Sequence, residues 1–391
     1  MAEPNPSHPR ILFLFSDTGG GHRSASEAII EALHLEFGDQ FSTEMVDIFR
    51  EYSPRPLSYM PDWYPKMVRL PRAWEIGFYL SNGPGRLRLI NASTWPYLRH
   101  SYHELFAQHP SDLIVSVHPL AITPVLWALG KPRPPFITVV TDLITAHGSW
   151  FNRNTDLCIV PTESACQRAI RFGLLPKQVK VVGLPVADRF CQPPGDKSQL
   201  RKRLGWPLDV PVILLMGGGE GMGPIESTAR TIDRAVLHAA LVIIAGRNQQ
   251  LKQKLEAHHW SMPTYIYGFV REMPDFMQAA DILITKAGPG TITEALNAGL
   301  PMILFSRLPG QEDGNVIYVV SEGAGVWAPT PSQICDTLNP WLQNPEQLAR
   351  VAQNSRRLAN PHAAREIARL LAVQVSRYSP AAQASKTTQK N

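Results

Sequence analysis

The sequence lacks any apolar run long enough to cross a bilayer. A membrane-spanning helix needs about 20 consecutive apolar residues, and the 391-residue chain contains no such run. The first ten residues are mostly polar, and the apolar stretch 11–15 is too short for the core of a signal peptide. We therefore expect a protein that stays in the cytoplasm.

Metal-binding patterns and strong charge are also scarce. The four cysteines form no C-x-x-C pair, and none has a histidine at zinc-site spacing, so we expect reduced thiols. The formal net charge of +5 is modest for this length. It favours an acidic partner only weakly, and nucleic acid, anionic lipid and a phosphorylated substrate stay open on charge alone.

Apolar runs of strand length alternate with helical patterns along most of the chain. This alternation predicts parallel sheets wrapped by helices. The expected strands cover 11–15, 44–48, 113–117, 136–140, 157–160 and 179–182, and then 212–216, 241–245, 265–267, 282–285 and 302–305.

The two groups of strands predict two Rossmann-like α/β domains that face a central cleft. The polar Pro/Gly stretch 191–198 is interpreted as a linker between domains 1–190 and 199–362. A helix over 363–378 and a disordered tail over 379–391 are expected to follow.

The first expected strand runs into a glycine-rich turn, SDTGGGH (16–22). Gly20 and Gly21 would leave the backbone open to a ligand at a helix start, where unpaired N–H groups favour negative charge. His22 is placed there to take a proton from a hydroxyl, and the alternative is a histidine bonded to its own loop. Asp17 is a candidate to hold the other ring nitrogen of His22. Asp142, at the end of strand 136–140, is a second candidate base.

A second glycine-rich turn, GGGEGMGP (217–224), follows the first strand of the second group. Its spacing fits neither G-x-G-x-x-G nor a P-loop. Five glycines around Gly218, Gly219 and Glu220 favour a phosphate cradle, and a simple tight strand–helix turn is the alternative.

A third motif, TKAGPGT (285–291), brings Lys286 to a strand end. The backbone N–H groups of Gly290 and Thr291 would bind a diphosphate at the start of the next helix, beside the charge of Lys286. Glu294, one turn further, would accept hydrogen bonds from ribose hydroxyls. The alternative for Thr291 and Glu294 is a capping box.

A fourth motif, GQEDGN (310–315), offers Gln311, Glu312 and Asn315 to a cluster of sugar hydroxyls, with a solvated turn as the alternative. No D-x-D pair occurs in the chain. Transferases that hold a nucleotide diphosphate through a divalent metal commonly need such a pair, so we expect donor binding without a metal and without a cofactor.

The segment 52–106 breaks the alternation of strands and helices. It holds eleven aromatic residues and seven Lys/Arg against three acids, punctuated by prolines. Trp and Tyr favour the membrane interface and basic residues an anionic surface, so the segment is expected to contact lipid. For some of the aromatics the alternative is the core of the domain. The candidates for lipid contact are Trp63, Trp74, Arg69, Arg72, Arg86 and Arg88.

In this order and at this spacing, the motifs SDTGGGH with RSASEA, VVTDL, GGGEGMGP, TKAGPGT and GQEDGNV resemble those of the monogalactosyldiacylglycerol synthases. They are more distantly similar to the N-acetylglucosaminyltransferase that completes the lipid-linked peptidoglycan precursor. The resemblance covers about residues 11–360. It implies a GT-B fold, an inverting mechanism, a UDP-sugar donor in the second domain and a C-terminal helix that crosses back to the first.

The resemblance also implies roles for single residues. His22 would be the catalytic base or a residue that assists it. The donor-binding roles fall on Phe269 and Val270 for the uracil, Glu294 for the ribose, Gly290 and Thr291 for the diphosphate, and Gln311 with Glu312 for the sugar.

The implied reaction transfers galactose from UDP-galactose to 1,2-diacylglycerol at a membrane surface. The alternatives are the same reaction with UDP-glucose and, more distantly, a UDP-sugar epimerase. The expected partners are the UDP-sugar, diacylglycerol and anionic lipids at the inner face of the membrane, without nucleic acid. Plant members carry a transit peptide, whereas ten residues precede the first expected strand here, which points to a bacterial-type or otherwise untargeted enzyme.

Overall fold

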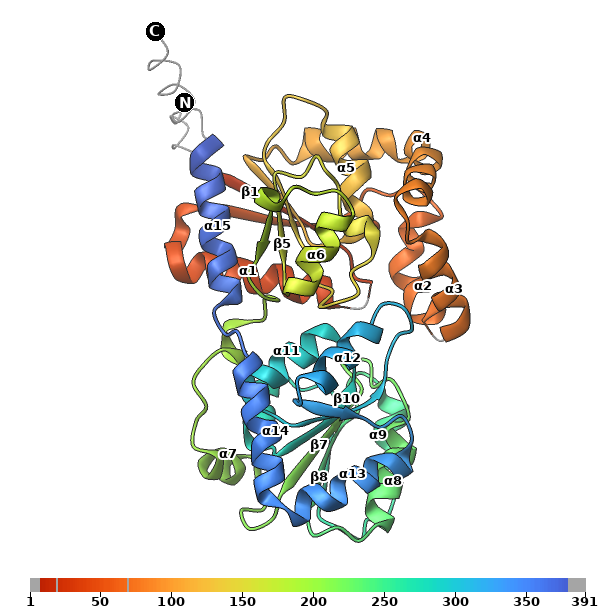
Figure 1. Cartoon of the computed structure of the whole chain (residues 1–391), viewed down its shortest axis with the longest axis vertical. Helices are drawn as coiled ribbons and strands as arrows, with labels where there is room; N and C mark the ends of the chain where they lie inside the picture. Colours follow the sequence, from red (N-terminus) through yellow and green to blue (C-terminus); the bar gives the residue numbers. More distant parts are fainter. Residues whose placement is uncertain (1–7, 19, 69, 379–391) are drawn as a thin grey trace. The chain divides into compact units, whose positions relative to one another are not determined.

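The computed structural model describes residues 8–18, 20–68 and 70–378, and the chain divides into two compact units (Figure 1). Unit 1 comprises Met1–Asp188, Pro309–Gln311 and His362–Asn391, and unit 2 comprises Arg189–Leu308 and Glu312–Pro361. Each unit contains a six-stranded sheet whose strands are all parallel. The two expected Rossmann-like domains are confirmed, while the tail predicted over 379–391 lies outside the described residues.

The sheet of unit 1 has the strand order β2-β1-β3-β4-β5-β6. Its strands are β1 (Arg10–Phe15), β2 (Ser42–Asp47), β3 (Leu113–Ser116), β4 (Phe136–Val139), β5 (Leu157–Val160) and β6 (Val179–Val181). The central strands β3, β4 and β5 are buried along their whole length. Helices cover both faces of a parallel sheet, which explains why these strands read as unbroken apolar runs.

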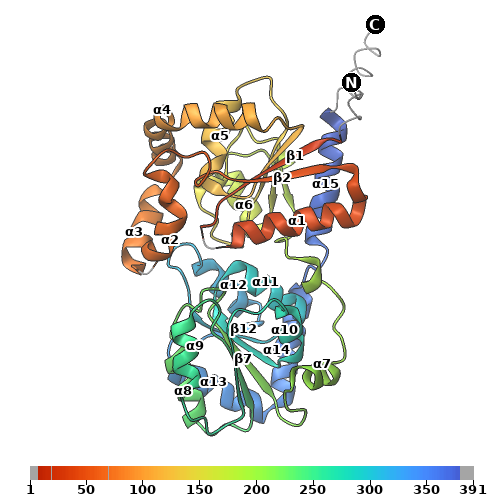
Figure 2. The same ribbon diagram turned by 180° about the vertical axis from the view of Figure 1, so that it is seen from behind.

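Two groups of helices cover the two faces of this sheet (Figures 1 and 2). The helices of unit 1 are α1 (Gly21–Phe37), α2 (Met60–Met67), α3 (Pro71–Ser81), α4 (Pro84–Gln108), α5 (Ile122–Leu129), α6 (Glu163–Arg171) and α15 (Ala363–Tyr378). α1 and α15 pack side by side on one face, where Ile29 and Leu371 are fully buried. α4, α5 and α6 contribute to the core of the other face. The C-terminal helix therefore returns to unit 1, as expected.

The segment that breaks the strand–helix alternation forms α2, α3 and α4. Each of these helices carries a proline in its first turn, namely Pro61, Pro71 and Pro84. Proline at that position loses no intrahelical hydrogen bond, so these three prolines mark helix starts, whereas Pro96 lies inside α4. Within the described ranges, no helix is both long and apolar enough to span a bilayer.

The sheet of unit 2 has the order β12-β11-β10-β7-β8-β9. Its strands are β7 (Val212–Met216), β8 (Ala240–Ile244), β9 (Thr264–Tyr267), β10 (Ile282–Lys286), β11 (Met302–Ser306) and β12 (Gly325–Trp327). β12, a three-residue strand at the edge of this sheet, was not predicted.

The helices of unit 2 are α7 (Lys197–Leu204), α8 (Ile225–Arg234), α9 (Gln249–Glu256), α10 (Met273–Ala279), α11 (Pro289–Ala298), α12 (Asp313–Ser321), α13 (Pro331–Gln343) and α14 (Pro345–Leu358). α8, α9 and α13 bury their apolar residues together against the sheet. α7 begins inside the stretch interpreted as a linker, because Asp196 caps it by accepting from the backbone N–H groups of Ser198 and Gln199.

In both sheets the strand order reverses beside the first strand. The chain passes from β1 to β2 on one side and then to β3 on the other, and likewise from β7 through β8 and β9 before it reaches β10. Loops that leave the two strands at such a reversal run to opposite faces and leave a crevice at the carboxyl ends. The fold therefore predicts one site after β1 and β3 and another after β7 and β10.

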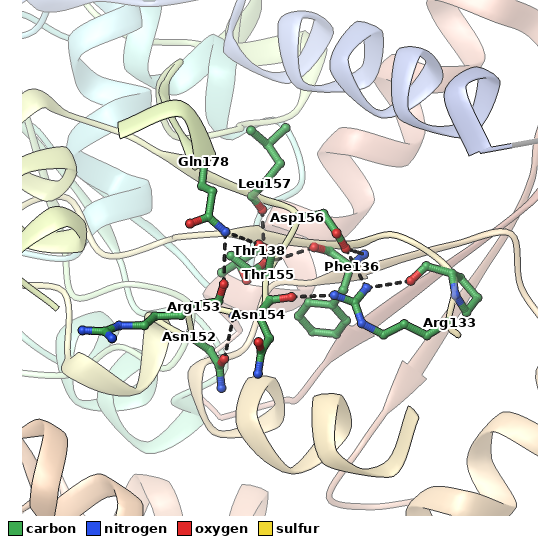
Figure 3. A network of polar contacts seen from close by, with 11 residues as sticks. Arg133, Phe136, Thr138, Asn152, Arg153, Asn154, Thr155, Asp156, Leu157 and Gln178 are labelled. Carbon is green, nitrogen blue, oxygen red and sulfur yellow. Dashed lines mark hydrogen bonds and ion pairs between the residues drawn. The ribbon is translucent and has the colours of Figure 1, made fainter. Parts of the chain in front are cut away.

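The amino ends of the unit 1 strands are instead tied together by polar contacts (Figure 3). Arg133 Nη1 lies 2.6 Å from Asp156 Oδ2, and the same oxygen accepts from the backbone N–H of Phe136 at the start of β4. Gln178 Nε2 donates to the carbonyl oxygen of Thr155. This network fixes the starts of β4 and β5, opposite to the candidate site.

Candidate active site

α1 begins directly at the glycine-rich turn that follows β1. Gly20 precedes the helix with a φ of 74°, a left-handed conformation that glycine adopts without strain. A Cβ added at Gly20 or Gly21 would meet no neighbouring atom within 4 Å. The backbone N–H groups of the first turn have no acceptor inside the helix, so the start of α1 is open to a ligand, as the predicted role of these glycines requires. Gly19 lies outside the described residues.

His22 lies in the first turn of α1, at the reversal point of the sheet. Its Nδ1 is 3.1 Å from Thr141 Oγ1, and its ring meets the edge of His118 with 4.7 Å between centroids. Burial lowers the pKa of His22 to about 4, against the opposing effect of a backbone hydrogen bond with Val117. The imidazole is therefore neutral at physiological pH and able to accept a proton.

The expected contact between Asp17 and His22 is wrong. The two carboxylate oxygens of Asp17 accept from Arg23 at 2.7 and 2.8 Å, and this hydrogen-bonded pair lowers the pKa of Asp17. A bidentate pair of this kind occupies the carboxylate. The Nδ1 of His22 is next to the hydroxyl of Thr141 and not to Asp17.

Asp142, the second candidate base, is buried after β4. Its Oδ2 accepts from Trp150 Nε1 at 2.7 Å, and its Oδ1 accepts from the side-chain amide of Gln311 at 3.0 Å. The Trp150 ring lies 6.0 Å from the ring of His22. Asp142 therefore fixes the indole beside His22. Gln311, expected at the sugar, belongs to the short segment 309–311 that groups with unit 1.

His118 and Ser16 are polar residues at this point that the sequence reading missed. His118 is 3% exposed, and its Nε2 lies 3.0 Å from Thr18 Oγ1. Neither His118 Nδ1 nor Ser16 Oγ has a hydrogen-bond partner among the described residues. Their positions directly after β3 and β1 were the signal that could have found them, and they leave hydrogen-bonding capacity beside His22.

In unit 2 the glycines of GGGEGMGP fall into two kinds. A Cβ at Gly217 would lie 1.9 Å from the carbonyl oxygen of Met222, and one at Gly221 would lie 2.2 Å from that of Ala245, so these two glycines permit close backbone packing. Gly218 and Gly219 make no such close approach to another backbone segment. A Cβ at Gly218 would meet Lys286 at 3.7 Å and one at Gly219 would meet Arg247 at 3.3 Å. The turn is thus tight, and its middle is flanked by two cations, which suits an anion.

The start of α11 is open in the same way. The helix begins at Pro289 with Gly288 before it, which places Gly290 and Thr291 in the first turn. Their backbone N–H groups have no acceptor within the helix, and a Cβ at Gly290 would meet nothing within 4 Å. Gly288 is the residue that caps the helix and Thr291 lies inside its first turn, so the alternative of a capping box between Thr291 and Glu294 is wrong.

Lys286 and Glu312 form an ion pair at the end of β10, with 3.0 Å between Nζ and Oε1. Glu312 is 6% exposed, and its other oxygen accepts from the backbone N–H of Leu308 at 2.7 Å. Two predicted donor-binding residues therefore neutralise each other. In the part of the chain that the structure describes, no group of three or more His, Cys, Asp or Glu residues could hold a metal ion.

Asn315, expected at the sugar, is buried and 1% exposed. Its Nδ2 donates to the carbonyl oxygen of Ala287 at 2.9 Å. This bond holds the loop between β10 and α11, so Asn315 shapes the start of α11, while its Oδ1 has no hydrogen-bond partner among the described residues.

Glu294 is part-buried on α11, and burial raises its pKa to about 8, against the opposing charge of Arg189. No hydrogen bond to its carboxylate is formed among the described residues. Hydrogen-bond donors from a ligand would therefore stabilise the ionised form of this carboxyl group, which burial disfavours. Phe269, expected at the uracil, follows β9 with 52% of its surface exposed, and Val270 beside it is half-buried.

The expected lipid-contact residues lie on α2, α3 and α4 in unit 1. Trp63 is 39% exposed, whereas Trp74 is half-buried, with its ring edge against Tyr64 at 5.4 Å between centroids. Arg72 and Arg88 are exposed. Arg69 lies outside the described residues.

Arg86 is exposed but has a local role as well. Its Nη1 donates to the carbonyl oxygens of Tyr79 and Leu80 at the end of α3, at 3.1 and 3.4 Å. The guanidinium therefore links α4 to the last turn of α3.

The same helices, and Leu70 just before α3, expose large apolar side chains. The most exposed are Leu70 (64%), Ile76 (60%), Leu80 (63%) and Leu89 (72%). We call these four residues, with Trp63, Arg72, Arg86 and Arg88, the apolar–basic surface. Exposed apolar groups gathered on neighbouring helices commonly mark an interaction surface.

Two family models match the two halves of the chain. Residues 22–186 match the model for monogalactosyldiacylglycerol (MGDG) synthase, and residues 212–370 match that for the glycosyltransferase family 28 C-terminal domain. The "Probable monogalactosyldiacylglycerol synthase 2, chloroplastic" of Oryza sativa subsp. japonica is 41% identical over 373 residues, covering 91% of this chain and 79% of that protein. The chain belongs to the monogalactosyldiacylglycerol synthase family. Monogalactosyldiacylglycerol synthase 3 of Arabidopsis thaliana is 38% identical over 369 residues, with the same coverage.

The solved structures that share the fold are less similar in sequence to this protein than the plant synthases are. MurG of Acinetobacter baumannii aligns with a TM-score of 0.62 at 16% identity, over 93% of this chain and 99% of that one. The glycotransferase of kitacinnamycin aligns with a TM-score of 0.63 at 14% identity, over 95% and 100%. These likenesses show the fold alone. Together with the family models they establish a glycosyltransferase built from two Rossmann-like domains of the GT-B type.

The raised pKa of Glu294 predicts how binding of a UDP-sugar depends on pH. If the ionised carboxylate accepts both ribose hydroxyls, protonation competes with binding below a pKa of about 8. The affinity, measured by calorimetry, should rise by about tenfold per pH unit toward pH 8 and then level off. Glu294→Gln should bind with an affinity that hardly changes with pH. A wild-type affinity that is flat between pH 6 and 8 would show that Glu294 does not bind the ribose.

Proposed function

We propose that this protein transfers galactose from UDP-galactose to the free hydroxyl of 1,2-diacylglycerol at a membrane surface. The observation that carries the proposal is the identity of about 40% with proteins named monogalactosyldiacylglycerol synthase over about nine tenths of the chain. The geometry of each unit supports it. Unit 1 offers a neutral histidine at an open helix start, and unit 2 offers an anion site with a carboxyl group for a diol.

The proposed reaction is one in-line displacement with inversion. The acceptor oxygen forms a bond to the anomeric carbon while the bond from that carbon to the diphosphate oxygen breaks, and the hydroxyl proton passes to His22. A base with a pKa of about 4 holds a proton weakly. The bond to the diphosphate must therefore be largely broken before the proton moves, and His22 then releases the proton to solvent.

Residues of unit 2 would stabilise the negative charge of the leaving UDP. The backbone N–H groups of Gly290 and Thr291 point out of the start of α11, where the helix dipole favours negative charge. Lys286 lies beside Gly218 and would exchange Glu312 for the diphosphate. We propose that these groups bind the donor without a divalent ion.

The proposed activity is tested by incubating the protein with labelled UDP-sugars and vesicles with or without diacylglycerol, followed by thin-layer chromatography. We expect galactolipid from UDP-galactose only when diacylglycerol is present, with undiminished yield in EDTA. Preferred use of UDP-glucose would show that the transferred sugar is glucose and not galactose. Isomerisation of the sugar without lipid product would establish an epimerase and contradict the transfer.

Because diacylglycerol stays in the bilayer, the enzyme must bind the membrane surface, and we propose that the apolar–basic surface makes this contact. Interfacial Trp and apolar side chains favour the boundary region, and each Lys/Arg near an anionic surface contributes about 1 kcal/mol. Replacing Arg72, Arg86 and Arg88 with Gln should release the protein from anionic vesicles in sedimentation assays, as high salt should. UDP affinity should be unchanged.

A matched control replaces three exposed basic residues of unit 2, Arg203, Arg234 and Arg271, with Gln. This variant loses the same charge outside the apolar–basic surface and should still bind vesicles. If both triple variants sediment equally with anionic vesicles, the lipid contact lies elsewhere.

A further inference from the structure

Three side chains from successive strand ends of unit 2 form a stack. Arg247, in the loop after β8, places its guanidinium 4.4 Å from the ring centroid of Phe269, in the loop after β9. Glu220, in the turn after β7, lies 2.8 Å from Arg247 Nη1. All three side chains are more than half exposed. The guanidinium thus covers one face of an aromatic ring that would otherwise be open to solvent.

The backbone fixes Arg247 at this point. Its N–H donates to the carbonyl oxygen of Gly219 at 2.8 Å, which joins the turn after β7 to the loop after β8. A Cβ at Gly246 would lie 2.3 Å from the same carbonyl oxygen, so the loops touch through their backbones. The backbone of Arg247 is therefore anchored beside Gly219, while its side chain is exposed.

Arg247 and Lys286 lie on the two flanks of the Gly218–Gly219 turn. A Cβ at Gly218 would be 3.7 Å from Lys286 Cε, and one at Gly219 would be 3.3 Å from Arg247 Nη1. The turn follows β7, which together with β10 forms the reversal point of the sheet. An anion bound at the turn would meet a cation on each side.

We propose that Arg247 holds the place of the nucleobase in the free enzyme and moves to the diphosphate when a uracil stacks on Phe269. The inference rests on the proposed function, because it takes a UDP-sugar as the donor. A guanidinium and a pyrimidine are both flat and stack on aromatic rings, so only one of them can occupy the same face of Phe269. Arginine also binds phosphate oxygens in a bidentate manner.

Glu220 sets the balance between the two positions of Arg247. In the free enzyme its carboxylate pairs with the guanidinium and favours the covered ring. Exposed ion pairs and exposed cation–π contacts are both weak, so a diphosphate with two negative charges can draw the guanidinium away. Glu220 thus makes Arg247 selective for a base that carries a diphosphate.

The experiment compares UDP with uridine, which has the base and ribose but no phosphate. Calorimetry on the full chain should show that Arg247→Ala weakens UDP binding by about tenfold, the loss of one charge-assisted contact. Uridine binding should be unchanged or tighter, because the face of Phe269 is freed. Glu220→Gln should tighten UDP binding by a few fold. Arg271→Ala, which removes an exposed arginine two residues after Phe269, is the matched control and should change neither affinity.

Thermal unfolding of each variant checks that the loops stay folded. Equal weakening of UDP and uridine by Arg247→Ala, or no change in either, would overturn the proposed role of Arg247. Failure of the wild-type protein to bind UDP would overturn the proposed donor together with this role. If the wild type makes galactolipid and Arg247→Ala is equally active at low UDP-galactose, the proposed function stands. Only the proposed role of Arg247 is then overturned.

Discussion

The candidate chemistry of this protein depends on the reversal of strand order in each sheet. Beside β1 and β3, and again beside β7 and β10, the loops leave for opposite faces of the sheet and leave a crevice at the carboxyl ends of the strands. His22 and His118 come together at the first reversal, and Lys286 and Gly218 at the second. In unit 2, Gly217, Gly221 and Gly246 follow from the same constraint, because the loops that line this crevice approach one another through their backbones.

Burial at these strand ends acts on two ionisable groups in opposite directions. It lowers the pKa of His22 to about 4 and raises that of Glu294 to about 8, because removing water penalises the charged form of either group. The neutral His22 can accept a proton. The protonated carboxyl of Glu294 would ionise when hydrogen-bond donors of a ligand take the place of water. Burial is the largest cause of both shifts, and it outweighs the backbone hydrogen bond with Val117 at His22 and the charge of Arg189 at Glu294.

The sequence was sufficient to predict eleven of the twelve strands in the described residues, the glycine-rich turns and the return of the C-terminal helix, because burial of most parallel strands leaves continuous apolar runs. The sequence could not predict which side chains contact one another. Asp17 stands five positions before His22, but its carboxylate is taken by Arg23. Asn315 sits in a polar motif yet is buried under the loop that it holds. Arg247 carries no motif, and only the adjacency of β7, β8 and β9 brings it to Phe269.

The central claim is that a desolvated, neutral His22 takes the acceptor proton, and the pH dependence of kcat at saturating substrates tests it most directly. The account predicts a kcat that is constant from neutrality down to about pH 5 and falls with an apparent pKa of about 4, while circular dichroism shows that the fold persists. His22→Ala should lower the plateau by about 10²–10⁴. An acid limb near pH 6.5 that disappears in His22→Ala would show a solvated histidine, and a variant that keeps more than about a third of wild-type kcat would show that His22 is not the base.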